Sequence, residues 1–153
     1  MKNQTTDDAI GFQLVTVARL LRQRFEAALA EADLNMTPGE ARTLLMADRQ
    51  GALRQNELAA ALSIEPMSLV AHLDRLEASG MVERQPDPDD RRSKRVHVTA
   101  LARPQLKRIA RVLNQAREGT MQDFSSEDTA RLHDYLQRMS RNLSAAGTGS
   151  GGH

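Results

Sequence analysis

The stretch that decides the fold runs from Leu62 to Thr99 and reads LSIEPMSLVAHLDRLEASGMVERQPDPDDRRSKRVHVT. Its first part has the spacing of a helix, because Leu69, Leu73 and Leu76 recur four and three residues apart and share one face. Gly80 stands where this helix should end, since glycine adopts a left-handed backbone without a Cβ clash. Two short apolar runs around a charged turn follow. The stretch therefore predicts a helix and then a β-hairpin.

The helix expected from Pro66 to Ser79 has a polar face that suits a DNA groove. An α-helix fits the major groove, where its N-terminal residues reach base edges. The residues expected to face DNA are Pro66, Met67, Ser68, Ala71, His72 and Arg75, and none of them is acidic. Met67 is expected within reach of a thymine methyl group. The alternative is an ordinary amphipathic helix with a solvated face.

The expected hairpin pairs Met81–Gln85 with Lys94–Val98, and the two prolines between these strands force a turn. Its basic residues suit the DNA backbone and the minor groove, where narrow A·T tracts concentrate negative potential. We expect an ion pair in which Asp90 sets the direction of Arg92. The alternative is a solvated hairpin with balanced charges. The hairpin residues expected at DNA are Asp90, Arg91, Arg92, Lys94 and Arg95.

Upstream of this stretch the sequence predicts the first half of a helix-turn-helix. Thr37-Pro38-Gly39-Glu40 has the pattern of a capping box and starts a helix that should stop near Gln50-Gly51. Ala52-Leu53 is expected to form a short bridge to the sheet. A brief helix from Gln55 to Leu62, a turn at 63–65 and the helix that begins at Pro66 complete the motif.

Long helical patterns flank the motif. Apolar residues recur every three or four positions from about Asp7 to Ala32 and again from Thr99, with Leu101 in the apolar pattern. Pro104 is expected either in the first turn of this second helix or at a kink in it. Ser125 to Asp128 should cap a last helix. These helices hold more apolar surface than a small domain buries, which favours a homodimer; the alternative is that the first helix packs on its own core. The residues expected in the dimer interface are Ile10, Leu14, Val17, Leu132, Leu136, Met139 and Leu143.

Composition limits the classes of protein. The chain has 153 residues, 40% of them apolar, and its 21 basic and 20 acidic side chains give a formal charge of +1. A nucleic-acid surface must therefore be local. The absence of cysteine excludes disulfides and thiolate zinc sites. Since neither a signal peptide nor a membrane-spanning stretch is found, we expect a cytoplasmic protein with no membrane partner.

The sequence offers little for catalysis or for a metal. It contains no glycine-rich phosphate loop and no nucleophile elbow, so we do not expect an enzyme. No two of the four histidines have the spacing of a helical metal site. We therefore expect neither a metal nor a cofactor, and a metal sensor is the weaker alternative.

The central stretch resembles the MarR family of winged-helix transcriptional regulators, and within it the SlyA-like branch. The residues that carry the resemblance are Ser63-Ile64-Glu65, Ser68-Leu69-Val70, Leu73-Asp74-Arg75-Leu76-Glu77, Gly80, Arg84-Gln85, Asp90-Arg91-Arg92, Lys94-Arg95, Thr99, Ala102 and Pro104. The expected fold is mainly α with a small β-hairpin, a winged helix-turn-helix with N- and C-terminal dimerisation helices. The expected segments are 1–36 and 100–145 for dimerisation, 37–99 for DNA binding, and a disordered tail at 146–153.

By this resemblance the protein would be a homodimer that binds a palindromic operator in double-stranded DNA, with Ser68 in the major groove and Arg92 in the minor groove. Repression relieved by a small aromatic carboxylate is also implied. The residues expected to line its pocket are Phe12, Arg19, Met36, Thr37 and Arg42, and the alternative is that they are ordinary core and surface residues.

The sequence departs from the SlyA-like pattern at two positions. The proline after Ile-Glu is shifted by one place to Pro66, and Ala71 stands where the branch tends to carry arginine. We therefore expect DNA binding but not the same operator. The alternative function is a winged-helix module that docks proteins without reading DNA sequence.

Overall fold

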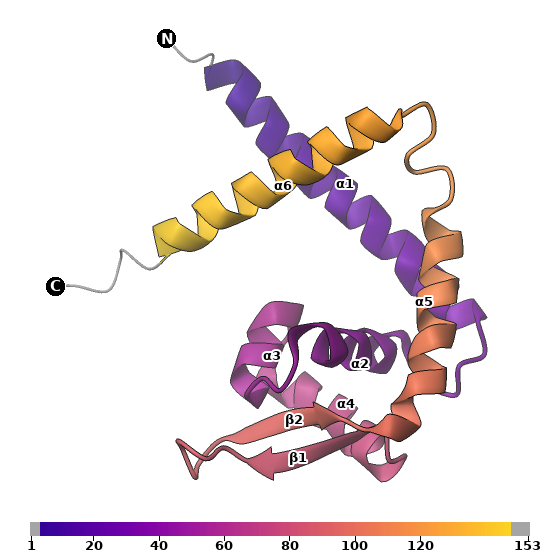
Figure 1. Cartoon of the computed structure of the whole chain (residues 1–153), viewed down its shortest axis with the longest axis vertical. Helices are drawn as coiled ribbons and strands as arrows, with labels where there is room; N and C mark the ends of the chain where they lie inside the picture. The colour runs from indigo at the N-terminus through magenta and orange to yellow at the C-terminus, as the bar shows by residue number, and fades with distance from the viewer. Residues whose placement is uncertain (1–3, 148–153) are drawn as a thin grey trace, which may run out of the picture. The chain divides into compact units, whose positions relative to one another are not determined.

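The computed structural model describes residues 4–147. They belong to two compact units that divide between Ala116 and Arg117. The elements are α1 (Gln4–Glu31), α2 (Pro38–Gln50), α3 (Gln55–Leu62), α4 (Pro66–Ala78), β1 (Val82–Pro86), β2 (Lys94–Val98), a 3₁₀ turn (Ala100–Ala102), α5 (Arg103–Arg117) and α6 (Ser126–Gly147) (Figure 1). This mainly helical fold with one hairpin confirms the predicted fold class.

The start of α2 forms as predicted. Thr37 Oγ1 accepts a hydrogen bond of 3.2 Å from the backbone N–H of Glu40, and the Glu40 carboxylate accepts one of 3.2 Å from the N–H of Thr37. These reciprocal bonds satisfy two backbone donors that a helix start leaves open. Pro38 occupies the first turn, and Gly51 ends the helix with a φ of 74°.

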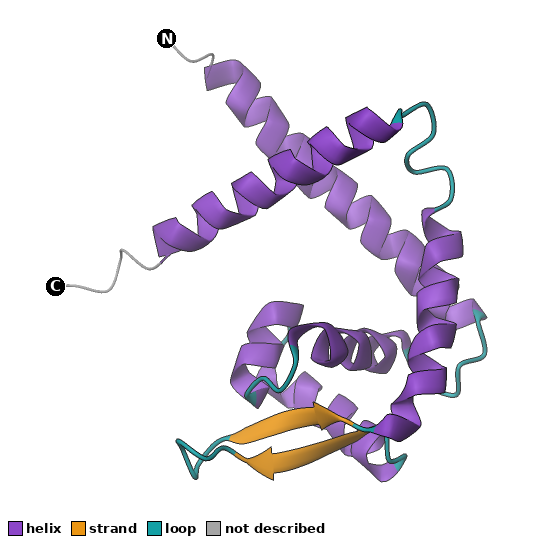
Figure 2. Ribbon diagram, viewed as in Figure 1, coloured by secondary structure: helices purple, strands orange, loops and turns teal. Residues whose placement is uncertain are grey.

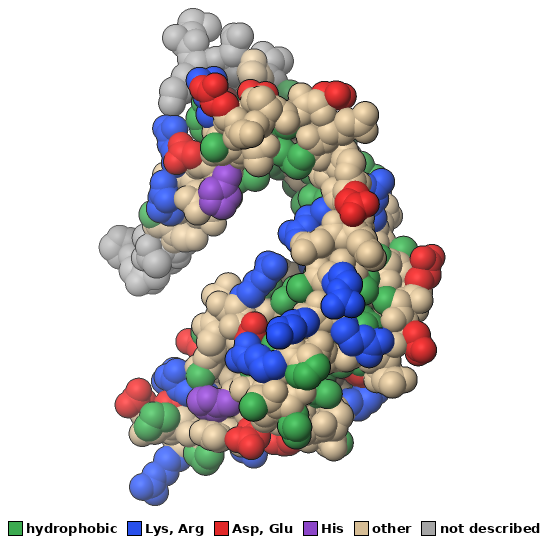
Figure 3. All heavy atoms as spheres, turned by 45° about the vertical axis from the view of Figure 1, so that its right-hand side comes forward, with side chains coloured by type: hydrophobic (Ala, Val, Ile, Leu, Met, Phe, Trp, Pro, Cys, Tyr) green, Lys and Arg blue, Asp and Glu red, His purple; other side chains and the backbone are tan. Residues whose placement is uncertain are grey.

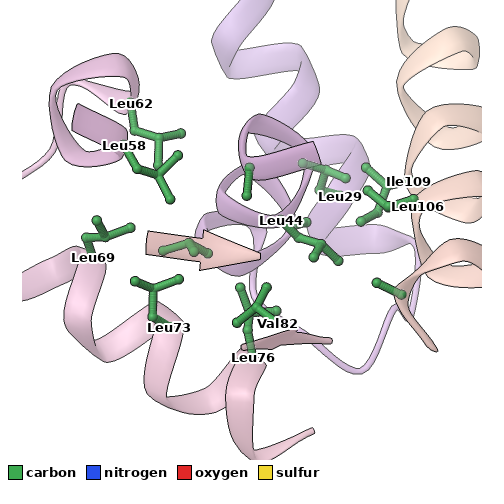
Figure 4. Close-up of a cluster of buried hydrophobic side chains, with 14 of the residues drawn as sticks. Leu29, Leu44, Leu58, Leu62, Leu69, Leu73, Leu76, Val82, Leu106 and Ile109 are labelled. Carbon is green, nitrogen blue, oxygen red and sulfur yellow. The ribbon is translucent and has the colours of Figure 1, made fainter. Parts of the chain in front are cut away.

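The core of the first unit lies where α2, α3, α4 and the hairpin meet (Figure 4). Leu69, Leu73 and Leu76 of α4 are at most 1% exposed, so the predicted leucine face is confirmed as the buried one. Val82 and Val96 add one buried side chain from each strand. Full burial of a leucine is worth about 1.5–3 kcal/mol, so this face fixes how α4 sits on the domain.

The two strands form an antiparallel hairpin, drawn in orange in Figure 2, in which Val82 pairs with Val98 and Pro86 with Lys94. β1 begins and ends one residue later than predicted. The backbone N–H of Val96 donates a hydrogen bond of 2.9 Å to the carbonyl of Leu53. The single bridge to the sheet is formed by Arg54 with Arg95, so its predicted place at Ala52-Leu53 is wrong by one residue.

Gly80 ends α4 and leads into β1. Its φ is 76°, in the left-handed region. Its N–H bonds the carbonyl of Glu77 at 2.9 Å, and the next N–H, of Met81, bonds that of Leu76 at 2.9 Å. The hydroxyl of Thr99 donates to the carbonyl of Gly80 at 2.5 Å. The predicted helix end is therefore confirmed, and Thr99, the residue that follows β2, joins it to the hairpin.

The helical pattern from Thr99 needs one correction. Leu101 is 70% exposed and Ala102 is fully buried instead. Residues 100–102 form a 3₁₀ turn, whose tighter rotation shifts which residue faces inward. Pro104 lies in the first turn of α5, as predicted.

In the second unit, α6 begins as predicted. The N–H of Asp128 donates to Ser125 Oγ at 3.0 Å, and the Asp128 carboxylate accepts from the N–H of Ser125 at 3.1 Å. These hydrogen bonds lower the pKa of Asp128. The helix continues through Gly147, so residues 146 and 147 are not part of a disordered tail. The rest of the predicted tail, 148–153, lies outside the described residues.

Between residues 4 and 147, no helix combines the length and apolar character needed to cross a membrane.

Candidate nucleic-acid interface

The start of α4 presents an exposed surface with little charge. Pro66, Met67, Ser68 and Ala71 are all exposed, and 78% of Met67 is accessible. We call these four residues the reading surface. The direction of α4 is set by Ser63, whose backbone is in the left-handed region with a φ of 53°, and by Pro66 in the first turn of the helix. The buried leucines on its other side leave this surface free to meet a groove.

His72 is not on the exposed face where the sequence placed it. It is half-buried against α2, and its Nδ1 lies 3.0 Å from Thr43 Oγ1. Because that hydroxyl donates at 2.8 Å to the carbonyl of Gly39, Nδ1 must be the donor in its contact with Thr43. Burial lowers the pKa of His72, and the nearby charge of Glu40 opposes this shift. His72 therefore holds α4 against α2.

Gly39 makes room for the His72 ring. A Cβ atom at position 39 would stand 2.7 Å from both Cε1 and Nε2 of the ring. Any larger residue would have to push the imidazole aside. The glycine of the capping sequence therefore has a second role, which is to let α4 approach α2.

Arg75 lies at the edge of the reading surface and is bound on one side. Its Nε donates to Oε1 of Glu40, a residue that is only 5% exposed. The other oxygen of Glu40 closes the capping box of α2. The Arg75 side chain is still 60% exposed, so it reaches the surface with one edge of its guanidinium occupied.

Three charged residues that sequence reasoning did not assign connect α4 to the base of the hairpin. Arg84 donates to Glu77 at 2.6 and 3.0 Å and to Asp74 at 2.7 Å. These hydrogen bonds from Arg84 are the main cause of the lowered pKa of Glu77. Two acids three residues apart, followed by an arginine on the next strand, were the available signal.

A buried carboxylate fixes the hairpin to the domain. Asp87 is 1% exposed and accepts hydrogen bonds from Arg54 Nε, from Arg95 Nε at 3.1 Å and from the N–H of Asp89 at 2.8 Å. Hydrogen bonding to Arg54 contributes most to lowering the pKa of Asp87 to about 2. Arg95 also donates at 3.0 Å to the carbonyl of Ala52. Arg95 is thus bonded to groups of its own chain, and its contact with DNA stays a prediction.

The end of the hairpin carries three exposed cations, Arg91, Arg92 and Lys94, which we call the wing tip. Asp90 stabilises this turn differently from the prediction. Its carboxylate accepts from the backbone N–H of Arg92 at 3.0 Å and from Ser93 Oγ at 3.1 Å, rather than forming an ion pair with the Arg92 guanidinium. The turn is therefore fixed through its backbone while the arginine side chains reach outward.

One groove of about 440 Å³ is lined by Pro66 of the reading surface and by Arg92 and Lys94 of the wing tip. Gln55 and Asn56 line it from the start of α3. The structure thus brings together residues that the sequence assigned to DNA from two separate elements. On the face that Figure 3 presents, a group of Lys and Arg side chains gathers near the middle with few acidic ones among them.

The five residues of the predicted effector pocket have different surroundings. Phe12 is 76% exposed on α1, and Arg19 lies 3.4 Å from Gln23 on the same helix. Met36 lines a cavity of about 290 Å³ that also touches the Glu40–Arg75 ion pair.

Arg42 is the member of this set best placed to meet an anion. It pairs with Glu26 of α1 at 3.0 Å, while its Nε is buried with no hydrogen-bond partner among the described residues. Thr37 is occupied in the cap of α2.

In each of the two units, some of the residues predicted for the dimer interface are exposed. On α1, Ile10 is 41% and Val17 51% exposed, and Leu14 is half-buried. On α6, Leu136 is 42% and Leu143 74% exposed. Leu132 and Met139 are half-buried.

No group of three or more histidines or carboxylates that could hold a metal occurs among residues 4–147.

Comparison shows which known proteins resemble this chain. Residues 36–94, which are less than half of the chain, match the model of the MarR family. A MarR family transcriptional regulator from Rhodococcus sp. RHA1 is similar to this chain, with 25% identity and a TM-score of 0.70 over 90% of this chain and 96% of that one.

Two further structures show the same fold. A MarR transcriptional regulator from Methanosarcina mazei Go1 has 20% identity and a TM-score of 0.73 over 91% of this chain and 99% of that one. The transcriptional regulator SlyA has 24% identity and a TM-score of 0.67 over 90% and 95%. The winged-helix fold of this family is therefore the fold of the chain.

Proposed function

We propose that this protein is a homodimeric, sequence-specific DNA-binding transcriptional regulator of the SlyA-like branch of the MarR family. The observation that carries the proposal is the groove between α3, α4 and the hairpin, which Pro66 at the start of α4 lines together with Arg92 and Lys94 of the wing tip. A helix start beside a cationic hairpin suits a major groove and the backbone next to it. The match of residues 36–94 to the MarR family model supports the same function.

The rigidity of this surface supports the proposal. The hairpin is joined to α4 through Arg84, and to the loop before α3 through Asp87 and Arg54. α4 is joined to α2 through His72 and Arg75. Contacts fixed before binding lose less conformational entropy when DNA is bound, so they favour affinity and a defined register.

The homodimer is proposed from the apolar side chains that each unit exposes. Val17 in the first unit and Leu143 in the second are each more than half exposed, and exposed apolar side chains are the material from which protein interfaces are built. In a two-fold dimer the two α4 helices would enter successive major grooves about one helical turn apart. That geometry predicts a palindromic operator. In this proposal residues 1–36 and 100–145 supply the dimer contacts and 37–99 bind DNA.

An effector is proposed from Arg42. A buried guanidinium N–H without a partner favours an incoming carboxylate, because an unsatisfied buried donor costs free energy. We propose that a small aromatic carboxylate binds near Arg42 and relieves repression. The protein would act in the cytoplasm, where it meets its operator.

The test is a mobility-shift series on duplexes selected from a random library with the full chain. Arg92→Ala should weaken binding about 5- to 100-fold and flatten the salt dependence, since each phosphate contact adds about 0.9 to the slope of log affinity against log salt. Arg111→Ala, which removes an exposed arginine from α5, is the matched control and should bind as the parent does.

Two outcomes count against the proposal. Equal affinity of the Arg92→Ala variant and the parent would show that the wing tip does not contact DNA. If no duplex is enriched, sequence-specific binding is refuted and the protein-docking module takes its place.

A further inference from the structure

The polar side chains of α4 are largely occupied within the protein. His72 is bonded to Thr43 and Arg75 Nε to Glu40. Asp74 and Glu77 are both bonded to Arg84. What the helix leaves free at its exposed start is the reading surface, whose side chains are a proline, a methionine, a serine and an alanine.

This surface lacks the groups that read purines by paired hydrogen bonds. Guanine is commonly recognised by arginine or lysine and adenine by asparagine or glutamine, each through two hydrogen bonds. α4 contains no lysine, asparagine or glutamine, and its one arginine, Arg75, has its Nε committed to Glu40. Hydrogen-bond readout by this helix is therefore restricted to the Ser68 hydroxyl, the free edge of Arg75 and Nε2 of the half-buried His72.

Apolar contact is the chemistry that remains. Met67 and Ala71 are four residues apart, so they lie on the same face of α4, one turn apart. Met67 is 78% exposed and carries a long, flexible thioether chain, while Ala71 allows a close approach of the helix. In the major groove the one apolar group that a base pair presents is the C5-methyl of thymine.

We propose that α4 recognises thymine through its C5-methyl group, with Met67 and Ala71 as the specificity-determining contacts. The inference rests on the proposed function and adds the chemistry of its reading step. Phosphate contacts by the wing tip would provide affinity, and methyl contacts would provide discrimination. The expected operator has thymine at the major-groove positions that α4 faces in each half-site.

The size of the effect follows from the methyl group. Burying one such group is worth about a fourfold change in affinity. Replacing thymine by deoxyuridine removes the methyl and keeps every hydrogen-bonding atom. One contacted thymine in each half of a palindrome should therefore weaken binding about 15-fold when both are replaced.

The experiment uses the full chain and the duplex that it enriches from a random library. Binding is measured by fluorescence anisotropy with thymine or deoxyuridine at each position in turn. Met67→Ala should lose most of the thymine preference at one symmetric pair of positions. Leu101→Ala, which shortens an apolar side chain outside α4 that is 70% exposed, is the control and should keep that preference.

The outcomes separate this inference from the function on which it rests. An enriched duplex that binds equally well with deoxyuridine at every position overturns thymine recognition and leaves the regulator intact. Loss of sequence preference on Arg75→Gln with an unchanged thymine preference in Met67→Ala overturns it as well. If no duplex is enriched, both the proposed function and this inference are refuted.

Discussion

Replacing Gly80 with alanine tests how α4 is joined to the hairpin. Gly80 has a φ of 76°, and an L-residue with a side chain pays about 1–2 kcal/mol in this left-handed region. The new Cβ would stand 3.3 Å from Cδ1 of Leu101, a side chain that is 70% exposed and free to turn away. The cost of the left-handed backbone therefore outweighs the cost of the contact with Leu101. We expect the free energy of unfolding to fall by about 1–2 kcal/mol and Tm by about 2–8 °C.

The assay is urea unfolding followed by circular dichroism at one chain concentration, because the stability of a dimer depends on concentration. Gly11→Ala is the matched control. Gly11 lies within α1 and an added Cβ there meets no heavy atom within 4 Å, so alanine should stabilise by up to about 1 kcal/mol. Gly80→Asn should be less harmful than Gly80→Ala, since asparagine tolerates this backbone. A Gly80→Ala variant as stable as the parent would refute the reasoning.

Three further substitutions have defined outcomes. Leu73→Ala, at a side chain with no exposure, should lower the free energy of unfolding by about 2–5 kcal/mol, whereas Met67→Ala should leave it nearly unchanged in the same urea series. The pKa of Asp87 is lowered from 3.8 to about 2, so the stability that its charge contributes is complete above about pH 4 and is lost as pH falls toward 2. Between pH 4 and pH 2 the Tm of Asp87→Asn should therefore fall less steeply than that of the parent. Burial lowers the pKa of His72 from 6.5, so the stability that its neutral ring contributes is present above that pH and lost as pH falls below it. His72→Gln should lack this loss, and a Tm profile that His72→Gln leaves unchanged would contradict the burial of the ring.

The elements of the fold were predictable because their signals are local. The capping box at Thr37, the helix end at Gly80 and the turn of the hairpin each depend on residues within a few positions of one another. The leucine face of α4 follows from spacing alone. Bounds within one or two residues could be predicted where such a signal occurs, whereas α1, expected from about Asp7, begins at Gln4.

The side-chain partners within the site could not be predicted in the same way. His72 was expected on the exposed face of the helix, although its spacing, three residues after Leu69 and four before Leu76, sets it beside the buried leucines. What periodicity could not supply was its partner, Thr43, which is 29 residues earlier in the chain. Asp87 likewise meets Arg54 across 33 residues, and only the folded hairpin brings them together.

The central claim, that a homodimer binds one DNA sequence specifically, is tested most directly by comparing two duplexes of equal length, the selected one and a scrambled one. The full chain is added to each at physiological salt. Fluorescence anisotropy gives the affinity, and sedimentation gives the number of chains bound to each duplex. The account predicts two chains for each duplex and a preference for the selected duplex of at least about a thousandfold. Equal affinity for the two duplexes, or one chain for each, would contradict it.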